Sequence, residues 1–441
     1  LGRPIYPAVA QVPDPVDLAV ILVPPPFVPG TLRECAARGI RAAIIATGGF
    51  KETGPQGAAL ETECLEIARQ HGMRLVGPNV IGFINTHLPL DTTFLQPPPP
   101  PAGEVAFISH SGAICAAVID WVRGQGFGLS YLLSLGNAAD VDETDVLEPV
   151  ASDSRTSVLT LYLETIHNGP RFVAAARQAS LQKPVVALKV GRFEAGKRAA
   201  ASHTGALAGS ETAFDAAFEK SGILRANTTE EMFQWARALA WSPLPRGPRM
   251  AVLTNAGGPG VTAADALEQN GLRLADLQEE TKAALRAILP AAASVQNPVD
   301  MLATAPPEHY AECLRPLLAD PGVDGVILIA PPPPSSSAGA VAKAIIPIIQ
   351  LSQKPVIVSL MGDRLIQEGV EFLRAAFIPE YHFPEWSASA MAALWRRAQA
   401  LARLQEQPAA LNGIDSHRAA ALLQPHPAAA WLPQDVANDL F

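Results

Sequence analysis

The residues best suited to chemistry surround a single histidine. The stretch KRAAASHTGALAGS, residues 197–210, places His203 among very small side chains. Imidazole is a good neutral nucleophile near pH 7, and small neighbours leave room for a large group to approach it. They also suit a segment that must stay accessible. A lone histidine is more often structural, and that alternative stays open for His203 at this point.

Two loops elsewhere in the chain share one design. The expected strand 104–108 is followed by SHSGAICAAVIDW, and the expected strand 250–253 by TNAGGPGVTAADAL. In each, a turn of small residues leads directly into a helix, so free backbone N–H groups and the positive end of the helix dipole face one point. Tight turns of this kind also need glycine for steric reasons alone. Together with His203, the two loops favour a shared anion site.

Several polar residues beside these loops have two readings. Glu164 follows the expected strand 157–163, at the sheet edge where α/β proteins place their sites, although a surface charge or helix cap would look the same. We expect a structural or supporting role for His110. The acidic run around Asp140, Asp142 and Glu143 fits no calcium loop, so we interpret it as a solvated turn. Asn297–Asp300 is either a turn and cap or part of the site.

Short apolar runs alternate with alanine-rich helical segments along the chain, for example VDLAVILV at 16–23 and AAIIA at 42–46. This alternation is typical of parallel βαβ units covered on both faces. The proline tract 97–101 and the segment 241–248 divide the pattern. We therefore predict the α/β class with three doubly wound parallel-sheet domains. The expected divisions are 1–100, 101–242, 243–405 and an Ala/Pro/Gln-rich linker at 406–441.

Bulk composition excludes several function classes. The 441 residues are 49% hydrophobic and 17% charged, with a formal net charge of −9, which argues for a globular protein and against a nucleic-acid partner. Four scattered cysteines form no CxxC pair, so neither a zinc site nor a disulfide framework is expected, and a reducing cytoplasm is the predicted location. The sequence contains no uninterrupted run of about 18 apolar residues, so we predict no membrane span. The start at Leu1, without a leader, suggests a shortened N-terminus.

The His203 segment, continued by ETAFDAAFEKSGI, resembles the phosphohistidine segment of NDP-forming acyl-CoA synthetases. That family includes ADP-forming acetyl-CoA synthetase and is related to the succinyl-CoA synthetase α subunit. Other motifs follow in the order of the family: VPPPF at 23–27, ATGGF at 46–50, GPNVIGFIN at 77–85, SHSGA at 109–113, SLGNAADVDETDVLE at 134–148, LYLET at 161–165, TNAGGPG at 254–260 and NPVDML at 297–302. The resemblance implies a partial Rossmann-like CoA-binding domain followed by two flavodoxin-like ligase domains.

The resemblance also implies a relay. Acyl-CoA and phosphate would give an acyl phosphate and free CoA, and the phosphoryl group would pass to His203. Glu164 would hydrogen-bond the imidazole ring and fix its tautomer. Two helix starts would hold phosphate without a metal ion. The implied phosphate-binding residues are Ser111, Gly112, Ala113, Asn255, Gly257 and Gly258.

Coenzyme A is the implied substrate of the first domain, although the family's glycine-rich first turn would lie upstream of Leu1. The surviving loops stand at the carboxyl ends of strands, as a ligand cleft requires. The family often has cysteine after GPN, where this chain has Val80, so a role close to the thiol is in doubt at that position. The implied CoA-binding residues are Val23, Pro24, Pro26, Phe27, Thr47, Gly48, Gly49, Asn79 and Ile81.

The substrates implied are acyl-CoA or a short carboxylic acid, while ADP or ATP with Mg²⁺ would be used by an ATP-grasp domain that we do not find in these residues. We therefore expect an ATP-grasp domain or β subunit as partner, within an oligomer. A non-catalytic acyl-CoA-sensing module is the alternative, and the retention of His203 and Glu164 favours catalysis. A succinyl-CoA synthetase-like α subunit fits less well, because that subunit lacks the third domain.

Overall fold

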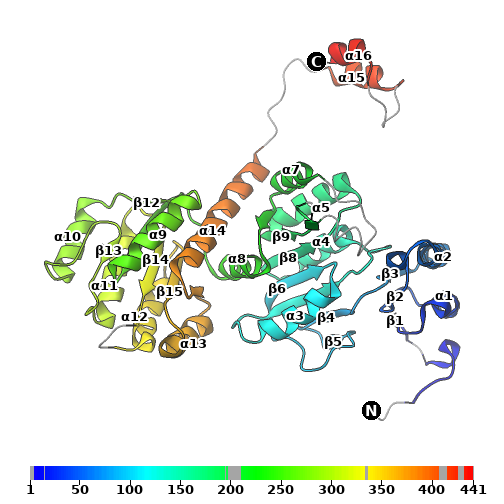
Figure 1. The fold of residues 1–441 in the computed structure, drawn as a ribbon, viewed down its shortest axis with the longest axis horizontal. Helices are drawn as coiled ribbons and strands as arrows, with labels where there is room; N and C mark the ends of the chain where they lie inside the picture. The colour runs from blue at the N-terminus through cyan, green and yellow to red at the C-terminus, as the bar shows by residue number, and fades with distance from the viewer. Residues whose placement is uncertain are drawn as a thin grey trace. The chain divides into compact units, whose positions relative to one another are not determined.

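The computed structural model describes residues 4–13, 15–193, 195–196, 210–332, 336–406, 415–425 and 432–440. The chain divides into two compact units, Leu1–Leu404 and Gln405–Phe441. The first unit contains three sheets in chain order, flanked by helices (Figure 1). The predicted α/β class with several mainly parallel sheets is confirmed.

The first sheet has three parallel strands in the order β1-β2-β3. Its strands are β1 (Leu18–Ile21), β2 (Ala42–Ile45) and β3 (Arg74–Val76), and its helices are α1 (Val28–Ala37) and α2 (Pro55–His71). Short 3-10 turns at Val9–Gln11, Pro25–Phe27 and Lys51–Thr53 complete it. Ile44, Ile45 and Phe50 are fully buried in or beside this sheet, which fixes the turn that follows β2.

The second sheet has seven strands in the order β10-β9-β8-β6-β7-β4-β5. Its strands are β4 (Phe83–Asn85), β5 (Leu90–Asp91), β6 (Ala102–Ser109), β7 (Leu129–Ser134), β8 (Val158–Leu163), β9 (Val185–Lys189) and β10 (Leu224–Ala226). Its helices are α3 (Gly112–Val122), α4 (Glu143–Ser152), α5 (Gly169–Gln182), α7 (Glu211–Ser221) and α8 (Thr229–Trp241).

Alternation along β6 explains how this sheet is covered on both faces. Val105 and Phe107 join the core that contains residues of α3 and α8, whereas Ala106 and Ile108 join the core of α4, α5 and α7 (Figure 1). Successive residues of a strand point to opposite faces, so a continuous apolar run serves two helix layers. The carboxyl ends of β6, β7 and β8 consequently share one edge.

The edge of the second sheet differs from the all-parallel expectation. β4 pairs antiparallel with β7, and β5 pairs antiparallel with β4. Residues 83–91 thus belong to the second sheet, whereas the expected first domain extended to residue 100. The change of sheet falls between β3 and β4, where the chain turns back along the free edge of β7.

The third sheet runs β12-β11-β14-β15-β16, with β13 also paired to β11, and its strand pairs are parallel. Its strands are β11 (Arg249–Thr254), β12 (Arg273–Leu274), β13 (Val299–Asp300), β14 (Gly325–Ala330), β15 (Val356–Leu360) and β16 (Glu380–Tyr381). Its helices are α9 (Gly257–Gln269), α10 (Glu279–Ile288), α11 (Pro307–Ala319), α12 (Ala338–Gln350), α13 (Gln367–Ala375) and α14 (Pro384–Gln405), with a 3-10 turn at Arg364–Ile366.

One hydrophobic core joins the second and third sheets, and α8, which the sequence pattern did not identify, lies in it. Trp235 of α8 donates from Nε1 to Ser389 Oγ of α14 at 2.9 Å. The Tyr381 hydroxyl donates to the Gln234 carbonyl oxygen at 2.6 Å. Aromatic side chains with their polar atoms paired make a well-defined contact, so the two sheets are packed together as parts of the first unit.

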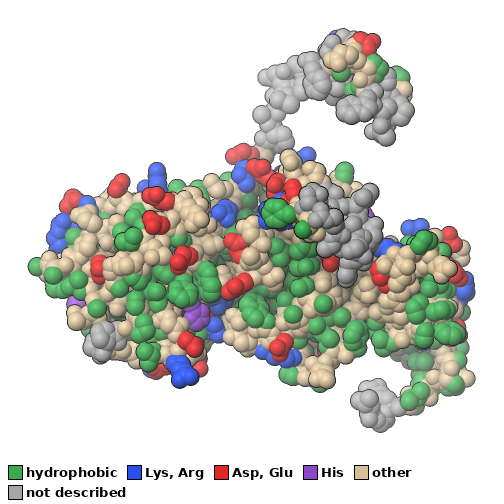
Figure 2. All heavy atoms as spheres, in the orientation of Figure 1, with side chains coloured by type: hydrophobic (Ala, Val, Ile, Leu, Met, Phe, Trp, Pro, Cys, Tyr) green, Lys and Arg blue, Asp and Glu red, His purple; other side chains and the backbone are tan. Residues whose placement is uncertain are grey.

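In the second unit, the structure describes two short helices, α15 (Ser416–Leu423) and α16 (Gln434–Leu440), within the segment expected to be a linker. Among the residues with described placement, no helix has the length and hydropathy needed to cross a bilayer. On the face drawn in Figure 2, lysine and arginine side chains are scattered among acidic ones.

Candidate functional site

The two predicted anion-binding loops have the same local hydrogen bonds. The hydroxyl of Ser109, the last residue of β6, accepts from Ser111 N and donates to Ser111 O, both at 3.0 Å. The hydroxyl of Thr254, the last residue of β11, accepts from Ala256 N at 3.1 Å and donates to Ala256 O at 3.0 Å. Helices α3 and α9 start directly after these turns, so the first N–H groups of both helices have no partner within the helix.

The surroundings of the two helix starts differ. Ser111 caps α3, with its hydroxyl accepting from Ile114 N at 3.4 Å. A Cβ atom on Gly112 would lie 2.9 Å from Ile81 Cγ2, so this start is packed against the segment between the first two sheets. A Cβ atom on Gly258 of α9 would meet no atom within 4 Å. The start of α9 therefore has open space beside it.

Asn255 precedes α9 and is buried, with 2% of its surface exposed. Its Oδ1 has no hydrogen-bond partner, and none of the described residues accepts from its amide nitrogen. A buried acceptor without a hydrogen-bond partner is unusual in a folded protein. The atom without a partner is an acceptor and would pair with a donor, while the amide nitrogen of the same side chain could donate to an anion at this helix start. Next to it, Asp300 Oδ2 lies 3.3 Å from the position of a Cβ atom on Gly257.

Glu164 follows β8 directly, at the carboxyl edge of the second sheet. Its backbone N–H donates to His110 Nδ1 at 3.2 Å, and His110 Nε2 lies 3.1 Å from Glu143 Oε2. His110 and Glu143 are both buried. The carboxylate of Glu164, half-buried, has no hydrogen bond to any described side chain, and together with burial it raises the pKa of Tyr162. The hydrogen bond from the Glu164 backbone N–H to His110 therefore connects Glu164 to the turn that contains Ser111.

The interpretation of 140–143 as a solvated acidic turn is wrong. Asp140 accepts from Arg74 Nε at 2.9 Å, and Asp142 caps α4 while accepting from Arg171 Nη1 at 3.0 Å. Glu143 is 1% exposed and pairs with His110. No cluster of metal-ligating side chains occurs in the described part of the chain. These acidic groups hold β3, α4 and α5 together.

The predicted CoA-binding loops come together at the carboxyl ends of β1, β2 and β3. Thr47 Oγ1 donates to the Val23 carbonyl at 2.8 Å, and Asn79 N donates to the Thr47 carbonyl at 3.0 Å. A Cβ atom on Gly48 would lie 3.0 Å from Asn79 Oδ1. One on Gly49 would lie 2.7 Å from Pro25 Cγ, so glycine is required for this approach.

The residues of these loops differ in exposure. Phe27 is 66% exposed, and Pro24 and Pro26 are exposed beside it. Val80, which stands where the family often has cysteine, is only 2% exposed. A side chain so buried has little contact with a ligand, whereas Ile81 next to it packs against Gly112 at the start of α3.

Residues that the sequence did not single out connect the CoA loops to the second sheet. Asn137, in the loop after β7, donates from Nδ2 to Glu52 Oε2 at 2.6 Å and to Glu61 Oε2 at 2.9 Å. Lys51 Nζ donates to the Asn137 carbonyl at 2.6 Å. Despite burial, which acts in the opposite direction, hydrogen bonds from Asn137 and from Gly49 N lower the pKa of Glu52. The only signal was the position of Asn137 inside the quoted motif 134–148.

Not every predicted residue is brought together. His203 lies outside the described residues. No hydrogen bond or ion pair between described residues joins the loop 255–258 to the turn 111–113. Asn297, for which two roles were open, accepts from Val252 N at 2.9 Å and donates to Met250 O at 2.8 Å, so its amide supports β11.

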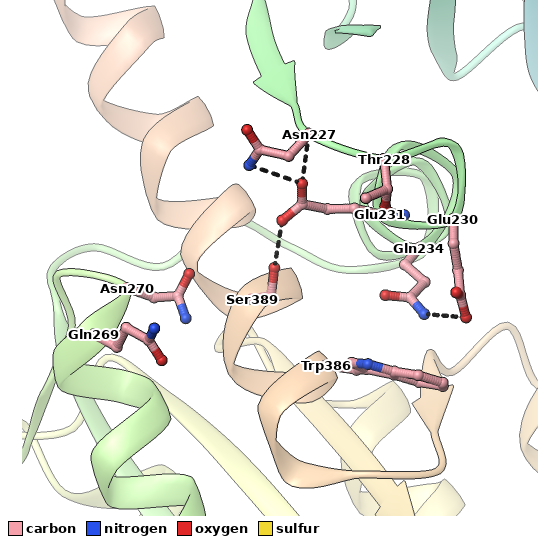
Figure 3. Close-up of a pocket in the computed structure, with 9 residues that line it drawn as sticks. All are labelled: Asn227, Thr228, Glu230, Glu231, Gln234, Gln269, Asn270, Trp386 and Ser389. Atoms are coloured by element: carbon pink, nitrogen blue, oxygen red, sulfur yellow. Dashed lines mark hydrogen bonds between the residues drawn. The ribbon is translucent and has the colours of Figure 1, made fainter. Parts of the chain in front are cut away.

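A separate polar cavity of about 450 Å³ lies between α8, α9 and α14 (Figure 3). Glu231 accepts there from the backbone N of Asn227 at 2.7 Å and from Ser389 Oγ at 3.3 Å, and Trp386 forms one wall. The cavity includes none of the predicted site residues. The two helix starts, in contrast, have backbone N–H groups without partners inside the helix, and the loops after β1, β2 and β3 contact one another, so we assign the candidate site to them and not to this cavity.

Three family models match the chain in order: a CoA binding domain over residues 1–86, a succinyl-CoA ligase like flavodoxin domain over 102–239 and a Ligase-CoA domain over 250–405. The chain is 44% identical over 404 residues to the alpha subunit of ADP-forming acetate–CoA ligase II of Pyrococcus furiosus, with 90% of this chain and 87% of that one covered. It is 36% identical to ADP-forming 4-hydroxybutyrate–CoA ligase of Nitrosopumilus maritimus, covering 89% of this chain and 56% of that one.

A solved structure is also similar. Dinucleotide forming acetyl-coenzyme A synthetase 1 of Ca. Korarchaeum cryptofilum, in complex with phosphate and ADP, matches with a TM-score of 0.87 and 38% identity, over 92% of this chain and 89% of that one. These relatives are ligases, and they give no support to the acyl-CoA-sensing alternative.

Proposed function

The chain belongs to the NDP-forming acyl-CoA synthetase family, as its CoA-ligase portion, and we propose that it interconverts acyl-CoA plus phosphate with acid plus CoA through His203. In the forward direction a phosphate oxygen attacks the thioester carbonyl carbon, the C–S bond breaks and CoA leaves as the thiolate. A ring nitrogen of His203 then attacks phosphorus, and the carboxylate of the acid leaves. The phosphoryl group finally passes to ADP on an ATP-grasp domain or β subunit.

The observation that carries this proposal is the contact between the predicted CoA cleft and the start of α3. Ile81 follows Asn79 in the cleft and packs on Gly112, whose neighbours Ser111 and Ala113 begin the helix. A thioester held by the cleft loops would thus reach a phosphate held by the α3 start. Backbone N–H groups and the helix dipole suit that dianion without a metal ion.

The remaining predicted residues have roles in the same scheme. Glu164 would bind the His203 ring and leave its other nitrogen free for attack. Asn255, Gly257 and Gly258 would form the second phosphate-facing start. We propose domains at 1–100, 101–242 and 243–405, with β4 and β5 of the first range paired into the sheet of the second, and with 406–441 leading towards the partner. Mg²⁺ and nucleotide would be used only on that partner, and the substrate of this chain would be an acyl-CoA or a short carboxylic acid.

A labelling experiment without nucleotide tests the proposal. The chain is incubated with acetyl-CoA and radiolabelled phosphate, and acid-labile, base-stable label is measured. We expect label in the parent chain, none in His203→Ala and a strong loss in Glu164→Gln. His167→Ala is the matched control, because His167 is exposed and lies three residues beyond Glu164. Absence of label in a parent chain that binds CoA, or label that survives His203→Ala, would contradict the relay.

A further inference from the structure

The buried pair of His110 and Glu143 has no part in the relay described above, yet it lies between its components. His110 stands between Ser109, the last residue of β6, and Ser111, the cap of α3. Glu143 is the first residue of α4. Only 6% of the His110 side chain and 2% of the Glu143 side chain are exposed. A buried ionisable pair is costly to keep, so its position deserves a physical reason.

The hydrogen bonds of His110 fix its tautomer. The backbone N–H of Glu164 can only donate, so His110 Nδ1, 3.2 Å away, must accept and carry no proton. The proton of the neutral ring is then on Nε2 and is donated to Glu143 Oε2 at 3.1 Å. Glu143, at the start of α4, is also favoured by the helix dipole. The carboxylate thereby holds the ring in one orientation.

The ring extends the sheet by one hydrogen bond. The backbone N–H of His110 donates to the Tyr162 carbonyl at 3.1 Å, which is the last backbone bond between β6 and β8. Beyond it, the His110 side chain takes the place of the next backbone acceptor and satisfies the N–H of Glu164. Glu164 and Ser111 are therefore fixed to one another through a single residue.

We propose that His110, oriented by Glu143, is a positioning residue for the relay: it sets the place of the Glu164 carboxylate relative to the start of α3. The inference rests on the proposed roles of His203 and Glu164. Misplacing a catalytic group by about 1 Å costs up to about a hundredfold in rate. Neither His110 nor Glu143 contacts the predicted CoA loops by a hydrogen bond between described residues, so substrate binding should be little affected.

The variants distinguish the effect of the hydrogen-bonding atoms of His110 and Glu143 from the effect of their ionisable groups. His110→Gln keeps an acceptor and a donor on one side chain, and Glu143→Gln keeps an acceptor for the imidazole proton. Replacing both residues by leucine removes the anchor while leaving an apolar pair, a change that buried ion pairs often tolerate in stability. His167→Leu changes an exposed histidine near Glu164 and is the control.

Initial rates of label incorporation from phosphate are measured over a range of acetyl-CoA concentrations. We expect the double leucine variant to lose about tenfold to a hundredfold in maximal rate with the KM for acetyl-CoA nearly unchanged. His110→Gln should recover most of the loss. If His110→Gln is as impaired as the leucine variant, the imidazole has another role and the proposal is overturned; equal activity of all variants overturns it as well.

A double-mutant cycle tests whether His110 acts through Glu164, and circular dichroism spectra show whether each variant is folded. His110→Leu is combined with Glu164→Gln, and residual rates are compared for chains with equal circular dichroism spectra. If His110 acts through Glu164, it adds little further loss once Glu164 is altered. Independent, multiplying losses would reject the positioning role. A parent chain that incorporates no label would instead reject the proposed function itself, so the two failures are distinguishable.

Discussion

Gly112 is the first residue of α3 and Gly258 the second residue of α9, and their surroundings predict opposite responses to alanine. Carbon atoms pack best at about 3.5–4.0 Å, and a Cβ on Gly112 would be 2.9 Å from Ile81 Cγ2. One side must therefore move. Overpacking of this kind costs about 1–3 kcal/mol of stability. The higher helix propensity of alanine compared with glycine offsets up to about 1 kcal/mol of that cost.

We expect Gly112→Ala to lower the free energy of unfolding by about 1–2 kcal/mol. Gly258→Ala meets only open space, so it should be neutral or stabilise by up to about 1 kcal/mol. Urea unfolding monitored by circular dichroism measures both, with unchanged m-values as the condition for comparing midpoints.

A double-mutant cycle identifies the clash. Ile81→Ala removes the obstructing methyl group at its own cost of about 2–5 kcal/mol, and in that background Gly112→Ala should cost about 1–2 kcal/mol less than alone. Equal tolerance of alanine at Gly112 and Gly258, or additive costs with Ile81→Ala, would refute the packing of the CoA-side loop on the start of α3.

Two further predictions concern ionisable groups. Because hydrogen bonds, against the opposing effect of burial, lower the pKa of Glu52, its charged form contributes stability above the ordinary glutamate pKa and loses it as pH falls through the lowered value. Glu52→Gln should therefore cost about 1 kcal/mol at pH 7, a difference that disappears once the pH has fallen below the lowered pKa of Glu52; a pH-independent difference in urea midpoint would contradict this. All four cysteines are buried, and burial raises the pKa of Cys64, Cys115 and Cys313 to about 12. We expect no reaction of the native chain with a thiol reagent at pH 8, and fast reaction at any one site would be inconsistent with this burial.

The parts of the site that were predictable from sequence are those set by neighbouring residues. The start of α3 after Ser109 and the start of α9 after Thr254 follow from small residues placed directly after apolar strands. The place of Glu164 at the end of β8 follows from the length of the apolar run before it. In each case a few consecutive residues contain the whole signal.

Contacts between distant segments left no such signal. Asp140 was interpreted as solvated because its partner, Arg74, comes from another sheet. The pairing of His110 with Glu143 likewise depends on how α4 packs beside the end of β6. The antiparallel β4 was missed because three residues, Phe83–Asn85, cannot indicate the direction of a strand; the free edge of β7 decides it.

The distribution of charge around the two helix starts determines how a phosphate bound there, as we propose, would be stabilised. Among the described residues, Asp300 has a carboxylate next to Gly257, and Glu164 is bound through its backbone N–H to His110, which precedes Ser111. These carboxylates would repel a phosphate bound there, whereas the backbone N–H groups and helix dipoles of the two helix starts would attract it. Glu143 would add to the repulsion if it were free, but the proton of His110 Nε2 is directed at it. Pairing the ring with Glu143 therefore both orients His110 and limits the negative charge that a bound phosphate meets.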